Sequence, residues 1–417
     1  MKGFNSNSRL VLLAFFIILT TSINAQASTS PSEESTVDYQ AYFKGMKVYL
    51  LTCGPGEKAY SLFGHTAIRV RQPMKGDDIV INYGIFSFAQ DYFVLRFVFG
   101  ITDYKMGICG FTDFEEEYRN EGRWVYQQEL NLSTKEKELL ARAIDINYEP
   151  QNRTYRYNCF YNNCTTKARD IIADNINGEI IYTDTERENI SFRDLCHSKT
   201  YNHRWSQFGN DLLLGIKADL PVDRNEQQFL PENLMKDFRT AVISDNNGNR
   251  RKLVCSEGYI IKNVHDKQSV TCPWTTPRSL IIFISLLIIC VTLYEVYSRK
   301  TFWLINAILL SATGLAGIIL FVMIFSQHPT VNINLQILIL NPISIFMAIP
   351  LAKRERKGYT SWWHTAYIIC LTTGIVAGLF QHFAEGILIL ALSLLIRFVI
   401  TYRRLNAKLP EMANKQQ

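Results

Sequence analysis

The feature that most constrains the fold of this chain is a series of five apolar blocks in its C-terminal third. They occupy residues 280–296, 302–325, 335–352, 366–380 and 386–402. Each is near the roughly 20 residues that a helix needs to cross the hydrocarbon core of a bilayer, although the fourth and fifth are somewhat short. We therefore predict an all-α transmembrane bundle of five helices over residues 279–404.

Basic residues are concentrated in alternate connections of these blocks. Arg299 and Lys300, the segment 353–357 and the segment 403–408 are basic, whereas 326–334 and 381–385 contain no Lys or Arg. By the positive-inside rule the basic loops and the C-terminus are cytoplasmic, which puts the region before the bundle outside. Many charges behind the net +6 are then topological anchors, so they do not indicate a nucleic-acid partner.

The N-terminus independently predicts export. Residues 1–27 contain Lys2 and Arg9, an apolar core at 10–19, and the small-x-small sequence Ala25-Gln26-Ala27. This pattern is typical of a signal peptide, with an uncleaved anchor as the alternative. We expect a multi-pass protein of the inner (cytoplasmic) membrane, with a periplasmic catalytic domain and a cytoplasmic C-terminus.

The exported region is expected to contain two parts. Residues 38–185 alternate strand and helix patterns and form the predicted catalytic core, and residues 186–275 form a covering subdomain. Ser133 and Glu136 have the spacing of a capping box, which predicts a helix start. The aromatic stretch from Phe86 to Tyr104 packs a core, or it lines an acyl-chain groove or lies at the bilayer interface.

Cysteine usage points to a free thiol. Two of the nine cysteines fall inside the apolar blocks, and the other seven are exported. An odd number in an oxidising compartment leaves at least one unpaired, and we expect this one to be Cys164. Cys255 and Cys272 flank an apparent hairpin and are the expected disulfide. Because no CxxC or HxxxH spacing occurs, neither a metal nor another cofactor is expected.

Cys164 lies in a stretch that suits a nucleophile. Residues 157–170 read YNCFYNNCTTKARD, followed by apolar positions at helical spacing. Asn163 is a good N-cap, so Cys164 falls in the first turn of the predicted helix. The unpaired N–H groups and the helix dipole favour negative charge there, which stabilises the thiolate.

The best candidate for a base is His65, at the start of a predicted strand. Residues 66–70 alternate in the manner of a half-buried strand, and 79–84 read as its antiparallel return. Asn82 is then roughly opposite His65 and orients the ring, or it is an ordinary strand-edge amide. His197 and His203 are weaker alternatives for the base, because neither precedes a clear strand.

A cysteine at a helix start, a histidine on a strand and a polar neighbour form the constellation of cysteine hydrolases. The chain order here is the reverse of papain's and resembles the circularly permuted papain-like enzymes, of the NlpC and lecithin:retinol acyltransferase (LRAT) groups. The LRAT group has H-x-A-x-x-V, a hairpin return ending in V-V-H, and Asn-Cys. This sequence has His65-Thr66-Ala67-Ile68-Arg69-Val70, Asn163-Cys164, and Asn82 in place of the second histidine. The resemblance implies an α+β permuted papain-like (NlpC/LRAT-like) extracytoplasmic domain.

A closer resemblance is to the family of the Lnb N-terminal periplasmic domain. It rests on Phe63-Gly64-His65, Asn82-Tyr83-Gly84, the block 163–170 and Phe229-Leu230-Pro231, and covers most of residues 40–240. The resemblance implies a lipoprotein N-acyltransferase of the bilayer. Such an enzyme moves an acyl chain from a membrane phospholipid, through a Cys164 thioester, to the α-amino group of a diacylated lipoprotein. Tyr83, Asn163 and Arg169 are the candidate substrate-binding residues, with an intradomain salt bridge as the alternative role for Arg169.

Two other functions remain open from the sequence. In the first, Cys164 is still the nucleophile but attacks a different substrate bond. Such an enzyme is an NlpC-type cysteine peptidase or amidase acting on peptidoglycan, or a lipid hydrolase. The other is a membrane-anchored binding module in which Cys164 forms a disulfide with Cys159 or Cys196. The acceptor in the first case is water, and in the second the thiol at Cys164 is absent.

Overall fold

The computed structural model describes residues 39–87, 89, 91–183, 189–245, 247–262 and 275–413. The expected signal peptide and Cys272 lie outside these residues. The chain forms two compact units. We call the first, residues 1–91, 102–188 and 223–267, the sheet unit, and the second, residues 92–101, 189–222 and 268–417, the helical unit.

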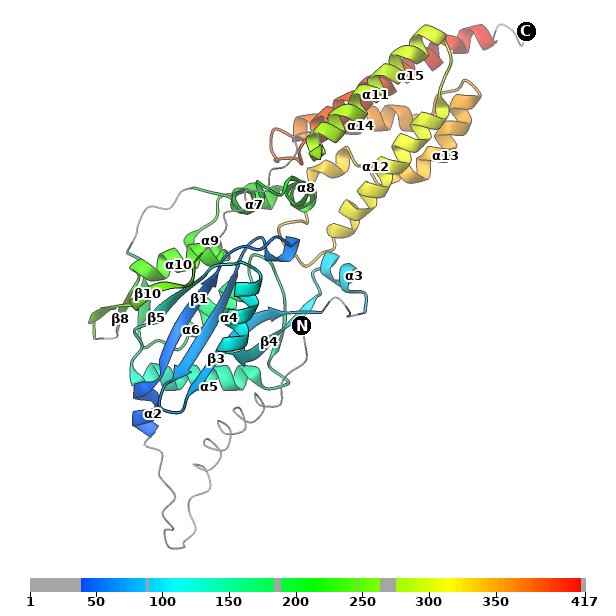
Figure 1. The fold of residues 1–417 in the computed structure, drawn as a ribbon. Helices are drawn as coiled ribbons and strands as arrows, with labels where there is room; N and C mark the ends of the chain where they lie inside the picture. The colour runs from blue at the N-terminus through cyan, green and yellow to red at the C-terminus, as the bar shows by residue number, and fades with distance from the viewer. Residues whose placement is uncertain are drawn as a thin grey trace. The chain divides into compact units, whose positions relative to one another are not determined.

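The sheet unit is built on one seven-stranded sheet in which every neighbouring pair is antiparallel (Figure 1). The central strands are rich in Val, Ile, Leu and Tyr, which suit a pleated sheet covered on both faces. In spatial order the strands are β10 (Val254–Ile261), β5 (Val125–Leu130), β1 (Lys47–Cys53), β2 (His65–Gln72), β3 (Asp77–Ile85), β4 (Asp103–Gly110) and β6 (Thr154–Arg156).

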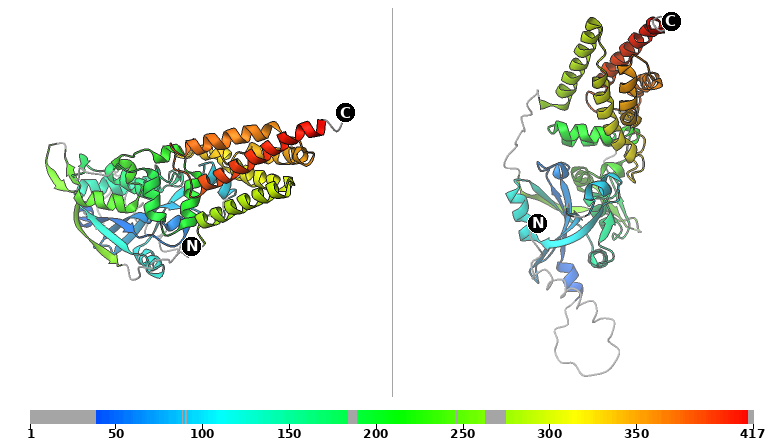
Figure 2. Two further views of the ribbon diagram at one scale, coloured as in Figure 1. Left: turned by 90° about the horizontal axis from the view of Figure 1, so that it is seen from above. Right: turned by 90° about the vertical axis from the view of Figure 1, so that its right-hand side faces the viewer.

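Helices cover both faces of this sheet (Figure 2). Alternate residues of one strand enter different cores: Leu50 packs with α5 (Thr134–Tyr148), α6 (Cys164–Ala173) and α10 (Pro231–Thr240), whereas Leu51 packs with α4 (Phe111–Asn120). The remaining elements are α2 (Tyr39–Gly45), η1 (Ala59–Ser61), α9 (Arg224–Gln227) and a three-stranded sheet of β7 (Glu179–Ile181), β8 (Val242–Ser244) and β9 (Arg250–Lys252).

The local predictions for this unit agree with the structure. Strand β2 begins at His65, α6 begins at Cys164, and Ser133 and Glu136 form the expected capping box of α5. An α/β, sheet-rich N-terminal region followed by membrane-like helices is therefore the observed fold class.

Among the residues that the structure describes, the helical unit contains five long helices. Three stretches are long and apolar enough to cross a membrane, so the predicted number of five spans is not confirmed. These are Pro277–Ser298, Trp303–Met323 and Leu335–Arg356. Helix α14 has 16 residues, which is short for a span. The long helices, from yellow-green to red in Figure 2, are α11 (Pro277–Ser298), α12 (Trp303–Met323), α13 (Ile343–Arg356), α14 (Trp362–Ala377) and α15 (Ile387–Ala413).

The segment expected as one covering subdomain, 186–275, is divided between the two units. Residues after 223 belong to the sheet unit because β10 extends the sheet beside β5. Residues 189–222 belong to the helical unit, where Asn334 and Gln336 donate to carbonyls of residues 211–213. This part contains α7 (Phe192–Thr200), α8 (Arg204–Leu213) and η2 (Ile216–Asp219); α3 (Phe93–Val98) and η4 (Leu335–Leu338) complete the unit.

The helical unit has a buried polar cluster to which each long helix contributes one residue. Arg397 donates to Asn306 at 2.5 Å and pairs with Glu295 at 2.8 Å. Glu355 accepts from Asn306 and lies 2.9 Å from the ring of His364. All five side chains are at most 2% exposed. These hydrogen bonds and ion pairs connect α11, α12, α13, α14 and α15, in addition to the apolar contacts between the helices.

Candidate active site

Cys164 is the first residue of α6, and Asn163 sets its position. The Asn163 side chain accepts from the N–H groups of Thr165 and Thr166 at 2.8 and 3.0 Å. The Thr166 hydroxyl accepts in turn from the N–H of Asn163, which completes a capping box. The cap leaves the N–H of Cys164 without an intrahelical acceptor, so this donor is available to an anion.

His65 lies between Cys164 and Asn82. Its Nε2 is 3.0 Å from Asn82 Oδ1, and its ring lies close enough to the Cys164 thiol for each group to shift the pKa of the other. Asn82 reaches the ring diagonally, because its partner in the β2–β3 register is Ala67 rather than His65. Since Nε2 donates to Asn82, Nδ1 is the nitrogen left to exchange a proton with the thiol.

The electrostatics of the site favour an ion pair. Burial opposes a charge on Cys164, but the neighbouring His65, the N–H of Thr66 and the Thr165 hydroxyl outweigh it and lower the pKa of the thiol from 9.0 to about 7. Burial also opposes a charge on His65, yet interactions with Cys164 and Asn82 raise its pKa above the usual 6.5. A thiolate beside an imidazolium is therefore well populated near neutral pH.

A glycine and three aromatic rings come from the segments next to this pair in the sequence and from the turn before α10. Gly64 has a φ of +82°, and a Cβ there would stand 2.7 Å from the carbonyl oxygen of Cys53. Only glycine lets the chain turn into β2 this close to β1. Phe63 and Phe160 both contact the ring of Phe229, with centroids 6.5 and 5.0 Å apart. Segments distant in the sequence thus form one apolar wall.

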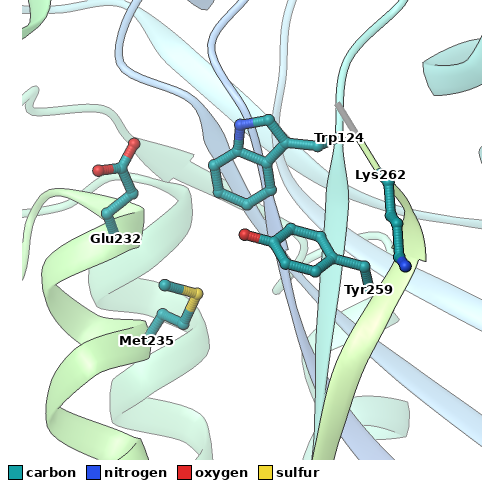
Figure 3. A pocket seen from close by; sticks show the side chains of 5 residues that line it. All are labelled: Trp124, Glu232, Met235, Tyr259 and Lys262. Atoms are coloured by element: carbon teal, nitrogen blue, oxygen red, sulfur yellow. The ribbon is translucent and has the colours of Figure 1, made fainter. Parts of the chain in front are cut away.

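A groove of about 570 Å³ lies in the same unit, between α10 and the ends of β5 and β10. By register its nearest strand is two strands from His65, because Cys53 of β1 pairs with both His65 and Val125. Figure 3 shows two aromatic side chains from the strand side facing a carboxylate and a thioether on α10. The lining residues are Trp124, Glu232, Met235, Tyr259 and Lys262.

The three residues predicted to bind substrate have partners inside the protein. Tyr83 is buried, and its hydroxyl donates to Asn147 at 2.8 Å. Asn163 caps α6 and donates to two nearby backbone carbonyls. Arg169 pairs with Asp170 at 2.7 Å, which is the salt bridge expected as its alternative role. Substrate binding by Tyr83, Asn163 or Arg169 stays a prediction.

The alternative bases belong to the helical unit. His197 Nε2 lies 2.8 Å from Asp211 Oδ1, and its ring contacts His382. The possible ligand atoms of His197, Asp211 and His382 lie within 4.8 Å of one another, which is close enough for all three to bind one metal ion. However, Arg193 already pairs with the Asp211 carboxylate at 2.8 Å, so the residues fit an ion-pair network better than a cation site.

The eight cysteines that the structure describes are all free thiols. Among them are Cys164 and both of its possible disulfide partners, Cys159 and Cys196. The disulfide expected between Cys255 and Cys272 is not seen at Cys255, whose thiol is free and exposed; Cys272 is outside the described residues.

The sequence did not predict the hydrogen bond between Asn82 and Cys109. The Asn82 amide donates to Sγ of Cys109 at 3.4 Å, which turns its carbonyl oxygen toward His65. Cys109 is on β4, paired with Val80, so its proximity depends on the register across three strands. No local pattern at residue 109 indicates this role.

Two family models match successive parts of the chain. Residues 35–198 match the Lnb N-terminal periplasmic domain, and residues 267–408 match the Lnb transmembrane domain. The two matches occur in the order and positions of the sheet-containing and membrane-like regions described above. The chain belongs to the Lnb family.

Membership of the Lnb family makes the protein a membrane enzyme of lipoprotein processing with a periplasmic N-terminal domain. No curated protein and no solved structure matches the chain.

Proposed function

We propose that this Lnb-family protein is a lipoprotein N-acyltransferase with a Cys164–His65 catalytic pair oriented by Asn82. The observation that carries the proposal is a cysteine at a capped helix start, beside a histidine that lowers its pKa and is itself held by an amide. This arrangement suits covalent acyl transfer because the thiolate is the attacking form. The donor is a membrane phospholipid and the acceptor a diacylated lipoprotein.

In the first half-reaction the Cys164 thiolate attacks an ester carbonyl of the phospholipid. The C–S bond forms and the carbonyl electron pair moves onto oxygen, where the N–H of Cys164 stabilises it. When the carbonyl re-forms, the ester C–O bond breaks, and the leaving alkoxide takes a proton from the His65 imidazolium. The products are a Cys164 thioester and a lysophospholipid.

In the second half-reaction the α-amino group of the diacylglyceryl-cysteine attacks the thioester. His65, now neutral, takes a proton from the attacking amine as the C–N bond forms. The C–S bond then breaks, which regenerates the thiolate and releases the triacylated lipoprotein. Because one product leaves before the second substrate reacts, ping-pong kinetics are expected.

The fold proposed for the catalytic region is the permuted papain-like one. It is supported by the antiparallel sheet and by α6, which packs on β2 and β3 and brings Cys164 to their ends. The chain order of histidine, amide and cysteine is the permuted order. We further propose an inner-membrane location with the C-terminus in the cytoplasm, supported by the distribution of basic loops.

An extracytoplasmic hydrolase is the second candidate, because the same thiolate can pass an acyl group to water. The helical unit favours the acyltransferase: its three candidate spans hold an enzyme where both of its lipidated substrates reside. A peptidoglycan hydrolase does not act on a lipidated substrate, so it does not need to be held at the bilayer by several spans.

The proposal is tested in cells depleted of their own N-acyltransferase. Wild type, Cys164→Ala and His65→Ala are expressed, and the N-terminal peptide of a model lipoprotein is weighed. A third acyl group is expected with wild type alone. A diacyl mass in the wild-type strain rejects the assignment, and released fatty acid in its place supports the hydrolase.

A further inference from the structure

The hydroxyl of Tyr155 has no assigned role in the fold or in the proposed mechanism. It is the central residue of β6, opposite Tyr104 of β4. Its hydroxyl is buried, and no acceptor for its proton is found among the residues that the structure describes. A buried hydroxyl whose proton has no acceptor destabilises the folded protein, so a ligand acceptor in this place would complete it.

The hydroxyl faces the same small space as the nucleophile. Gly84 of β3 has a φ of +90°, and a Cβ placed on it would stand 3.7 Å from Cys164 Cβ and 4.0 Å from Tyr155 Oη. Both the cysteine and the phenol therefore border the space that a side chain at Gly84 would fill. An acyl carbonyl bound to Cys164 Sγ needs such a volume.

We propose that the Tyr155 hydroxyl is the second donor of the oxyanion hole and acts with the backbone N–H of Cys164. The proposal rests on the acyl transfer proposed above and names the donor that its tetrahedral intermediates require. When the thiolate adds to the ester, the electron pair that moves onto oxygen accepts the Tyr155 O–H bond. The proton stays on Tyr155, and the bond weakens again as the carbonyl re-forms. The same donor serves the tetrahedral intermediate of aminolysis.

The protonation state of Tyr155 fits this role. Burial, and then the charge on nearby Cys164, raise the pKa of Tyr155 well above its ordinary 10.0. The phenol is therefore a donor across the neutral range in which Cys164 becomes a thiolate. Its ring is held edge-to-face against Tyr83, with centroids 6.2 Å apart, so the hydroxyl is oriented before substrate arrives.

The experiment compares Tyr155→Phe with wild type in the purified full-length protein, in liposomes containing the donor phospholipid. Acyl-enzyme formation is followed by intact mass in a single turnover. Loss of one oxyanion donor is expected to slow this step by about 100-fold or more. Tyr49→Phe is the matched control, because it removes a buried hydroxyl from the opposite face of the sheet.

A second measurement separates this role from a structural one. Alkylation of Cys164 by iodoacetamide needs the thiolate but forms no oxyanion, so Tyr155→Phe should keep the wild-type alkylation rate and pH midpoint. Acylation at the wild-type rate overturns the proposal. So does a parallel loss of acylation and alkylation, because that result shows a damaged site.

Failure of the proposed function is distinguished with a p-nitrophenyl ester, which also passes through a tetrahedral oxyanion. If wild type cleaves this ester but takes no acyl group from phospholipid, the acyltransferase assignment falls. Tyr155 is then tested by the rate ratio on the ester alone, where a loss of about 100-fold or more supports it. A ratio near one, or a wild type inert to both substrates, overturns it.

Discussion

At the residue scale, the proposed acyl transfer depends on the pairing of Cys164 with His65. Each group is buried enough to disfavour its own charge, and each is charged because of the other. Neither residue would have a useful pKa alone in this position. The pair is consequently expected to titrate as a unit, with the thiolate–imidazolium form persisting between the two steps.

We predict that His65→Ala raises the pH midpoint of Cys164 alkylation well above the wild-type value of about 7. The substitution removes the two largest effects that lower the pKa of the thiol, whereas burial, which raises it, remains. The thiol is then protonated throughout the neutral range, and acylation is expected to fall by about 100-fold or more. Alkylation by iodoacetamide, followed from acidic to alkaline pH, measures the shift, and an unchanged midpoint contradicts the pairing.

Asn82→Ala is predicted to lower kcat by about 10-fold through loss of one hydrogen bond of roughly 1.4 kcal/mol that orients the ring. Asn82→His is the matched variant, because an imidazole there can accept from His65 Nε2, as the amide oxygen does at 3.0 Å. It should recover part of the lost rate. Steady-state kinetics on the model lipopeptide test this, and equal rates for Asn82→Ala and wild type exclude an orienting role.

At the scale of elements, α5 and α6 begin with the same capping motif, which has a different consequence in each helix. Both helices open on a capping box, with Asn163 and Thr166 in one and Ser133 and Glu136 in the other. Only in α6 is the N-cap residue followed directly by a cysteine that lies beside a histidine. The cap thus contributes stability in both helices, and in α6 it also positions the proposed nucleophile.

We predict that Asn163→Ala and Ser133→Ala each destabilise the protein by about 1 kcal/mol, the usual cost of a lost N-cap. Only Asn163→Ala is expected to slow acylation, because it also frees the loop held through the carbonyls of Cys159 and Phe229. Thermal unfolding and single-turnover acylation are measured on both variants. Equal activity in the two would show that the α6 cap is structural alone.

At the scale of the whole molecule, each unit has its own core, and the two cores are built differently. The sheet unit buries apolar side chains on both faces of one sheet. The helical unit adds to its apolar contacts the charged cluster around Arg397. Because a charge is costly inside a bilayer, each member of that cluster depends on its partners.

Arg397→Met is predicted to destabilise the helical unit by about 3–5 kcal/mol, because Glu295 loses its cationic partner while staying buried. Arg404→Met, near the end of the same helix, is the control, since Arg404 is only partly buried and donates to the backbone carbonyl of Lys300. Thermal unfolding in detergent measures both. A similar unfolding temperature for the two variants contradicts a stabilising role for the cluster.

Much of the sheet unit was predictable because its determinants are local. A strand start at His65 follows from alternation of neighbouring residues, and a helix start at Cys164 follows from the Asn163 cap. The prediction of five spans is not confirmed, because three stretches of the described residues have the length and composition of a span and α14, with 16 residues, is short for one. The division of residues 186–275 was missed because it depends on contacts with distant segments, such as β5 for β10.

The sequence by itself determined the thiol, the imidazole, the helix cap and the apolar helices, since each depends on residues within a few positions of one another. Tertiary structure alone decided that Asn82 reaches His65 diagonally, that Cys109 accepts from the Asn82 amide, and that Cys164 and Tyr155 both lie next to Gly84. These contacts depend on strand register and on the irregularity of β3 between Asn82 and Ile85. A shift of one residue in a strand moves every side chain to the other face, and no local pattern specifies that choice.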